Sequence, residues 1–368
     1  MIRHRAGRAR QAPKGRPITG ACSWVSIDVV QRRIADSFMR VFQTRHLREL
    51  LICAIAAALF GPTIGVAAET YPSRPVRMLV PYPPGGGLDP IGRAIGQKFL
   101  ESTGQSFVHD NRGGAGGLIA TELVAHAAPD GYTLLLASNG QLSMAPWLHP
   151  KLPYDPLEDF VPITHFVDTP MVLFAHAGFP AKTVKELVAQ AKAQPGTIRI
   201  GLSGVGGVSH LTMELFRQKV GITFSPVPYR GAGAAMVDVA NGSVPLIFST
   251  LAAGKGLLDA GRLRALAVST AKRSSALPDV PSLIELGYPG VESSLWIGMV
   301  APKGTPRAII AKLEDEFAKA LASSDVRERF KTQSAEINGG KSKEFRRTIA
   351  ADSERWRTVI QTANIKLE

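Results

Sequence analysis

Glycine-rich loops that stand directly before predicted helices are the residues of this 368-residue chain best suited to bind a small molecule. A glycine loop that leads into a helix points unpaired N–H groups and the positive end of the helix dipole at one spot, which favours an anion. Glycine also lets a ligand approach the backbone without a Cβ in the way. One such loop could equally be only a tight turn, but several at equivalent places favour binding. The loops lie at 85–87, 113–117, 203–207 and 231–233.

Other chemistries find less support. Three of these loops approach the dinucleotide-binding pattern, but Ile119, Ser209 and Met236 stand where the third glycine belongs. The six histidines after residue 68 include no i, i+4 pair, and that part of the chain has no cysteine, so a zinc site has little to build on. No Walker sequence and no Gly-x-Ser-x-Gly turn is present. The sequence therefore predicts a binding protein, not an enzyme, without cofactor or metal.

The elements that must position these loops alternate regularly along the chain. Predicted strands lie at 76–82, 106–109, 132–137, 198–201, 227–229, 244–249 and 263–269. Predicted helices lie at 90–103, 118–127, 183–193, 210–220 and 234–241, with two more near the C-terminus. Alternating strands and helices imply an α/β fold with mainly parallel sheets, in which ligands bind beyond the carboxyl ends of the strands. Because every glycine loop follows such an end, we expect one cleft between two lobes with a hinge between them.

Helix starts show local signals as well. Asp89 is predicted to cap the helix that Pro90 begins, and Ser209 the helix at 210–220. Thr305 is predicted to cap a helix that begins at Pro306. His210, directly behind a glycine loop, is the one histidine expected near the cleft, where it is either a ligand contact or a structural hydrogen-bonder.

The first 68 residues differ from the rest and predict export. Basic residues at 40–48 precede the apolar run 50–60, and the small residues Val66, Ala67 and Ala68 follow, which is the order of a cleaved secretory signal. The apolar run is shorter than the roughly 20 residues of a spanning helix. We therefore expect a periplasmic protein that begins near Glu69. A true translation start at Met39 is a further hypothesis.

The charge of the chain is concentrated in this leader. Residues 1–68 carry a net +8 of the +13 of the whole chain, which leaves +5 for the remainder. No basic stripe interleaved with aromatic residues follows residue 69, so nucleic-acid binding is not expected. Both cysteines, Cys22 and Cys53, also lie in the leader. A mature chain of about 300 residues has a core large enough to need no disulfide.

Motifs along the whole mature chain resemble those of the Bug family, the extracytoplasmic solute-binding proteins of tripartite tricarboxylate transporters. They occur in order and cover essentially all of it, and as a combination they are highly specific. The matching stretches are 71–77, 80–87 with Asp89, 111–117, 128–135, 151–156, 227–231, 261–268 and 276–281.

The resemblance implies a two-lobed periplasmic-binding-protein fold of type II. One lobe would hold residues 69–170 plus 290–368, and the other residues 171–289. Family ligands are small carboxylates, and the membrane components of the transporter would be partners. Backbone amides and bridging waters of the loops that face the cleft would hold one carboxylate. The ligand-binding residues expected from the loops and the resemblance are Tyr82, Gly85, Gly86, Gly87, Leu88, Asp89, Ser138, Asn139, Gly140, Ser203, Gly204, Gly206, His210, Tyr229, Ser249 and Thr250.

Two positions depart from the family pattern. Leu88 replaces the hydroxyl residue common before the aspartate, which suggests a more apolar ligand or a different water arrangement. Ser249 stands where many relatives have an aspartate that suits ligands with an amino group, which argues against an amino-acid ligand. Two other roles stay open: a sensor that presents the ligand-closed protein to a membrane kinase, and an enzyme on the same fold.

Overall fold

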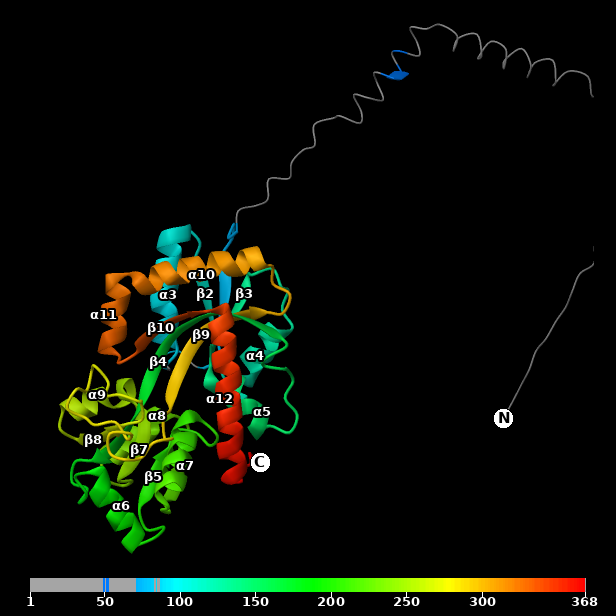
Figure 1. Ribbon diagram of the computed structural model, residues 1–368. Coiled ribbons are helices and arrows are strands. Elements are labelled where there is room, and N and C mark those ends of the chain that lie inside the picture. The colour runs from blue at the N-terminus through cyan, green and yellow to red at the C-terminus, as the bar shows by residue number, and fades with distance from the viewer. Residues whose placement is uncertain (1–48, 50, 53–70, 83, 85–86, 368) are drawn as a thin grey trace, which may run out of the picture. The chain divides into compact units, whose positions relative to one another are not determined.

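The strands of a computed structural model form one mixed sheet that passes through two lobes (Figure 1). The structure describes residues 49, 51–52, 71–82, 84 and 87–367. The predicted leader and its signal sequence lie outside the described residues, apart from Glu49, Leu51 and Ile52. Residues 69–368 form one compact unit, and the two lobes lie within it.

The first lobe is built on three parallel strands. β1 (Val76–Val80) lies between β2 (Phe107–Asn111) and β3 (Thr133–Ser138), and β3 pairs antiparallel with β9 (Ser294–Pro302). The helical segments of this lobe are α3 (Asp89–Thr103), η1 (Ala115–Gly117), α4 (Leu118–Ala125), the π-helix η2 (Gly140–Met144), α5 (Ala145–Leu148), α10 (Arg307–Ala322), α11 (Ser324–Thr332) and α12 (Ser342–Thr362).

The second lobe repeats this parallel arrangement. β5 (Arg199–Leu202) lies between β6 (Ser225–Pro228) and β7 (Leu246–Thr250) and pairs in parallel with both. The remaining elements are α6 (Val184–Ala193), α7 (Val208–Val220), α8 (Ala232–Ala240), α9 (Leu251–Asp259) and β8 (Leu263–Val268). The two lobes together confirm the predicted α/β class.

A long strand that the sequence pattern did not predict joins the lobes. β4 (Phe160–His176) pairs with β9 and β10 (Glu336–Lys341) over its first part, and with β7 and β8 from Met171 onward. Pro162 lies at a register shift in its pairing with β9, where a residue without an N–H is tolerated. Pro162, Pro170 and the charged Asp168 interrupt the alternation that normally indicates a strand.

In each lobe the sheet is covered on both faces, so each lobe has its own apolar core. In the first lobe, Phe99 and Phe317 of α3 and α10 pack on one face. Trp296 and Phe345 pack on the other, which α4 and α12 cover. The second lobe likewise has two apolar clusters of its own. The predicted lobe boundaries at 170 and 290 stay a prediction.

Helix α12 reaches from the first lobe to α7 of the second (Figure 1). Its Trp356, fully buried, lies in one apolar cluster with Leu148 of α5 and Leu211 of α7. This cluster holds the start of α7, and with it the glycine loop at 203–207, close to the first lobe. Among the helices that the structure describes, none has both the length and the apolar character needed to span a bilayer.

Three predicted helix caps are wrong. Leu88, not Asp89, is the N-cap of α3, and the Asp89 carboxylate accepts from Arg93 at 2.9 Å inside the helix. The hydroxyl of Ser209 binds the Phe248 carbonyl instead of its own helix, because α7 begins earlier, at Val208. Thr305 likewise donates to the carbonyl of Pro302, and Pro306 becomes the N-cap.

Strand β9 brings the chain back from the second lobe to the first and pairs with β4, and we call these two the hinge strands. β9 requires a glycine at position 298. A Cβ at Gly298 would lie 2.5 Å from the Phe345 ring and 2.7 Å from the Thr164 carbonyl oxygen. We therefore expect Gly298→Ala to lower the free energy of unfolding by about 1–3 kcal/mol, as overpacking does. In the matched control Gly256→Ala, on α9, a Cβ meets nothing within 4 Å, so stability should stay equal or rise slightly. Urea unfolding of both variants measures this, and equal stabilities would contradict it.

Candidate functional site

The carboxyl ends of the parallel strands in both lobes meet the middle of β4. Ser138, the last residue of β3, lies opposite Ile297 of β9, which in turn lies opposite Val167 of β4. Thr250, the last residue of β7, lies opposite Met171. Four residues of strand separate the two points on β4, roughly 13 Å along its axis. The loops that follow strands in both lobes therefore converge on one hinge region, as a ligand cleft requires. We call this convergence the ligand cleft.

In the first lobe, the side chain of Gln141 ties three of these loops together. Its Oε1 accepts from the backbone N–H and the hydroxyl of Ser138, at 3.1 and 2.9 Å. Its Nε2 donates to the Tyr82 hydroxyl at 2.7 Å and to the Gly116 carbonyl at 3.0 Å. Gln141 is fully buried, and Asn111 adds a bond to the Tyr82 carbonyl at 2.9 Å. Sequence reasoning missed Gln141, although it directly follows the predicted 138–140 loop.

In the second lobe, Ser209 and backbone bonds perform the same task. The Ser209 hydroxyl donates to the Phe248 carbonyl at 2.5 Å and accepts weakly from the Ser203 N–H at 3.5 Å. The Gly231 N–H donates to the Ser203 carbonyl at 3.1 Å. The loops after β5 and β6 are thus tied to each other and to strand β7.

Asn139 connects the first lobe to the start of the hinge strand β9. Its Nδ2 donates to the Ser294 carbonyl at 2.8 Å. Its Oδ1 is buried and has no hydrogen-bond partner among the described residues. A buried acceptor without a partner costs about 1–3 kcal/mol, so a water or a ligand hydroxyl that donates to it would stabilise the site.

Several of the loop amides that were expected to be free are already used. Gly117 donates to Gly114, Gly207 to Gly204, and Gly206 donates its N–H to Nδ1 of His210 at 3.1 Å. For these amides the prediction of unpaired N–H groups is wrong, because the loops fold back on themselves in tight turns.

The other predicted residues lie as follows. Gly85 and Gly86 are outside the described residues, whereas Gly87 lies near the Leu295 side chain of β9. Leu88 is buried in the apolar core, so it has little surface left for a ligand. The Tyr229 hydroxyl donates to Asp238 at 2.6 Å. Gly140 begins the π-helix, and Ser249 and Thr250 end β7 beside β4.

Two titratable side chains of the cleft, Tyr82 and His210, are held in their neutral forms. Burial raises the pKa of Tyr82, although its bonds to Gln141 and Ser138 act in the opposite direction, so the phenol stays protonated. Burial lowers the pKa of His210, helped by Arg217 and opposed by Glu214. In the part of the chain that the structure describes, no group of three His, Cys, Asp or Glu side chains could hold a metal ion.

Two α/β lobes joined by hinge strands, with strand-end loops from both converging on the hinge, define a solute-binding protein of the periplasmic type. Similar solved structures agree. A Rhodopseudomonas palustris protein, Rpa4515, solved with adipate, is 36% identical with a TM-score of 0.75 over 81% of this chain and 100% of its own. The periplasmic binding protein BugD is 34% identical with a TM-score of 0.72 over 81% and 100%. MatC of R. palustris, solved with malate, is 31% identical with a TM-score of 0.71 over 79% and 100%.

The sequence comparisons name the family. Residues 91–365 match the tripartite tricarboxylate transporter family receptor. Protein BugT of Bordetella pertussis is 38% identical over 322 residues, which is 87% of this chain and 99% of BugT. The chain therefore belongs to the tripartite tricarboxylate transporter receptor family, and the predicted Bug resemblance is confirmed.

His210 should make the stability of the protein sensitive to acid. Because the Gly206 N–H donates to Nδ1 of His210, the imidazole ring must be neutral. Protonation of Nδ1 would break this hydrogen bond. A histidine whose folded pKa lies below its unfolded value of 6.5 favours the fold above that pH, and this contribution is lost as the pH falls further.

We expect the free energy of unfolding to fall more between pH 8 and pH 5 in the unsubstituted protein than in His210→Gln. Glutamine can accept the same bond without titrating in this range. Urea unfolding at both pH values measures the difference, and an equal loss in the two proteins would contradict it. Partial burial also lowers the pKa of His109, but this half-buried residue is present in both proteins, so its effect cancels.

Proposed function

We propose that this protein is exported to the periplasm, where it captures a small carboxylate between its lobes and delivers it to the membrane components of a tripartite tricarboxylate transporter. It acts by binding and release, without catalysis. Its relatives Rpa4515 and MatC, solved with adipate and malate, support a dicarboxylate or a related acid as the solute.

The observation that carries this proposal is that two cleft glycines are not required by the fold. Gly206 needs its left-handed backbone, with φ +75°, and a Cβ there would lie 2.8 Å from Leu148. Gly87 and Gly204 have no left-handed φ. Among the described residues, a Cβ at Gly87 would meet only Leu295, at 3.9 Å, and one at Gly204 would meet none within 4 Å. The missing side chains therefore leave room for a ligand against the backbone, one glycine in each lobe.

A carboxylate in this space would be held by backbone amides. Each charged hydrogen bond contributes about 1.5–3 kcal/mol once water is excluded. Two or three of them with a few apolar contacts give a micromolar affinity, about −8 kcal/mol. Ser249 leaves the end of β7 without a carboxylate that would pair with an amino group. The solute is therefore proposed to be an acid without an amino group.

We expect Gly87→Val and Gly204→Val to weaken carboxylate binding more than tenfold while the protein stays folded, because each side chain fills space that the carboxylate needs. Arg230→Ala should weaken binding less, since Arg230 is exposed and makes no ion pair with any described residue. Calorimetry with malate, adipate and citrate measures affinity, and circular dichroism confirms folding. Gly206→Val serves as the contrast, because it should destabilise the fold itself.

A clamp by the Arg230 side chain makes the opposite prediction. Arginine can pair with a carboxylate through two parallel hydrogen bonds. If Arg230→Ala abolishes binding and both valine variants keep it, the backbone-anion site is wrong.

Export can be tested separately. We expect the mature protein from the periplasmic fraction to begin near Glu69, because the basic, apolar and small residues before it follow the order of a cleaved signal. Mass spectrometry of the intact protein measures its N-terminus. An intact leader in the periplasm would overturn this prediction.

A further inference from the structure

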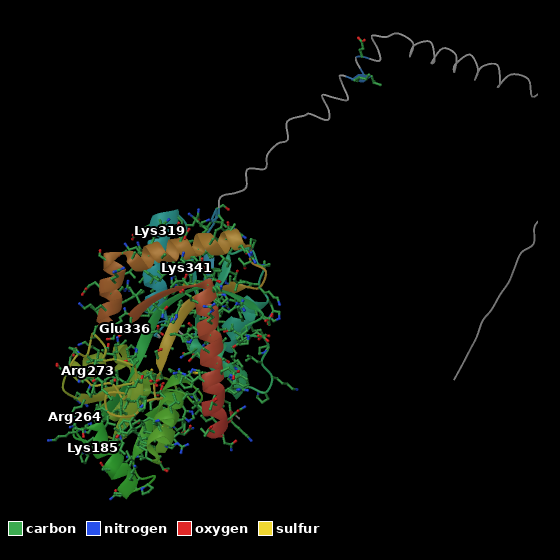
Figure 2. All side chains as sticks on the ribbon, viewed as in Figure 1. Lys185, Arg264, Arg273, Lys319, Glu336 and Lys341 are labelled. Atoms are coloured by element: carbon green, nitrogen blue, oxygen red, sulfur yellow. The ribbon has the colours of Figure 1, made fainter. Side chains whose placement is uncertain are left out.

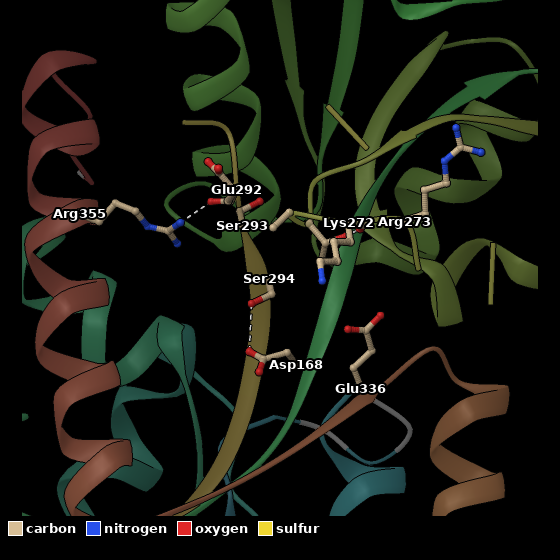
Figure 3. A pocket seen from close by; sticks show the side chains of 10 residues that line it. Asp168, Lys272, Arg273, Glu292, Ser293, Ser294, Glu336 and Arg355 are labelled. Atoms are coloured by element: carbon tan, nitrogen blue, oxygen red, sulfur yellow. Dashed lines mark hydrogen bonds between the residues drawn. The ribbon is translucent and has the colours of Figure 1, made fainter. Parts of the chain in front are cut away.

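A second hollow lies at the hinge, apart from the ligand cleft, and both lobes line it (Figure 3). It has a volume of about 350 Å³. Its walls include Asp168 and Ser294 of the hinge strands, Lys272 and Arg273 of the loop after β8, Glu336 of β10 and Arg355 of α12. We call it the rear pocket.

The rear pocket and the ligand cleft lie on opposite faces of the hinge strands. Successive residues of a strand point to opposite faces. Leu295 faces the cleft loop at Gly87, whereas Trp296, the next residue, packs on Phe345 of α12. Asp168 pairs with Trp296 across the two strands and so shares its face. A rotation about these strands that closes the cleft must therefore widen the rear pocket, and one that opens the cleft must narrow it.

The floor of the rear pocket is a fixed negative charge. The Asp168 carboxylate accepts from the Ser294 hydroxyl at 3.1 Å and from Asn338 Nδ2 at 2.9 Å, and it lies 3.3 Å from Nε2 of His165. Burial disfavours its ionised form, but these partners outweigh burial and lower its pKa. The carboxylate thus stays charged and joins β4, β9 and β10.

Two opposite charges face each other across the opening above this floor. Lys272 extends from the second lobe and Glu336 from the first, and their charged ends point toward one another (Figure 3). Neither makes an ion pair with any described residue. The neighbouring cations are already engaged: Arg273 pairs with Glu285 at 2.7 Å, and Arg355 pairs with Asp352 at 2.8 Å and donates to the Glu292 carbonyl. Lys272 is thus the cation of this pocket that a rotation can pair.

We propose that the rear pocket is a charge latch, in which Lys272 of the second lobe pairs with Glu336, above Asp168, when the ligand cleft opens, and separates from it when the cleft closes. The latch stabilises the open form, so a solute must offset it to close the lobes. The latch proposal rests on the proposed ligand cleft but does not depend on which solute the cleft binds.

Spin labels on the two lobes test the latch without any added solute. Cysteines replace Gln97 on α3 and Lys185 on α6, both exposed, and Cys22 and Cys53 are changed to serine (Figure 2 labels Lys185). Pulsed electron resonance then gives the distance distribution between the lobes. Lys272→Gln and Glu336→Gln should each shift the open-to-closed ratio by about two- to fivefold, the range for an exposed pair. The double variant should shift it no further than either single variant.

The controls separate this pair from general charge effects. Lys192→Gln and Glu328→Gln, exposed and without ion pairs among the described residues, should leave the distribution unchanged. The unsubstituted protein in about 1 M salt, where screening shortens to about 3 Å, should move in the same direction as the latch variants. No shift, or shifts that add in the double variant, would overturn the latch.

Measurements with malate and adipate then test whether the latch variants shift the protein toward the closed form. Whichever of them binds should move the unsubstituted protein toward the distribution of the latch variants, and should bind those variants two- to fivefold more tightly. A ligand-induced shift away from that distribution would overturn the latch. If neither acid binds, the proposed solute class fails, whereas the coupling between Lys272 and Glu336 is still decided by the unliganded distances.

Discussion

The pairing register of β4 is the constraint on which the binding apparatus depends. This one strand takes part in the sheets of both lobes, and its middle lies opposite the ends of β3, through β9, and of β7. A shift of one residue would move every side chain of β4 to the other face. Asp168 would then face the cleft instead of the rear pocket. The register thus decides both where the loops meet and which charges lie behind them.

Within each lobe, polar side chains make the binding edge move as a unit. Gln141 crosslinks the loops after β1, β2 and β3, and Ser209 crosslinks the loop after β5 to strand β7. Since both are buried, loss of either would leave several buried polar groups without partners, which is costly. In the proposed closure of the lobes, the hinge strands would therefore take up the conformational change and the loops would keep their shape.

The glycines of the cleft fall into two physical classes. At Gly117 and Gly206 the backbone has a left-handed φ and neighbouring side chains occupy the place of a Cβ, so the fold itself requires glycine. At Gly87 and Gly204 neither condition holds. A sequence pattern treats all four alike, because it contains neither the φ angles nor the neighbours. The φ angles and the neighbouring atoms separate the glycines that the turns require from those that are proposed to leave room for a solute.

The sequence by itself determined the class of the protein and the order of most of its elements, but it predicted none of the strands β4, β9 and β10. Strands, glycine loops and helices alternate at spacings that local chemistry sets, and α6 begins at its N-cap Thr183 and α3 ends at its C-cap Gly104, as expected. Tertiary structure decided the rest. β4 was not predicted because its prolines and buried polar residues are tolerated only by its particular partners. Gln141 meets Tyr82, and Lys272 faces Glu336, only because packing brings together residues that are far apart in the sequence. Local sequence carries no signal for such contacts, because they depend on how distant segments meet.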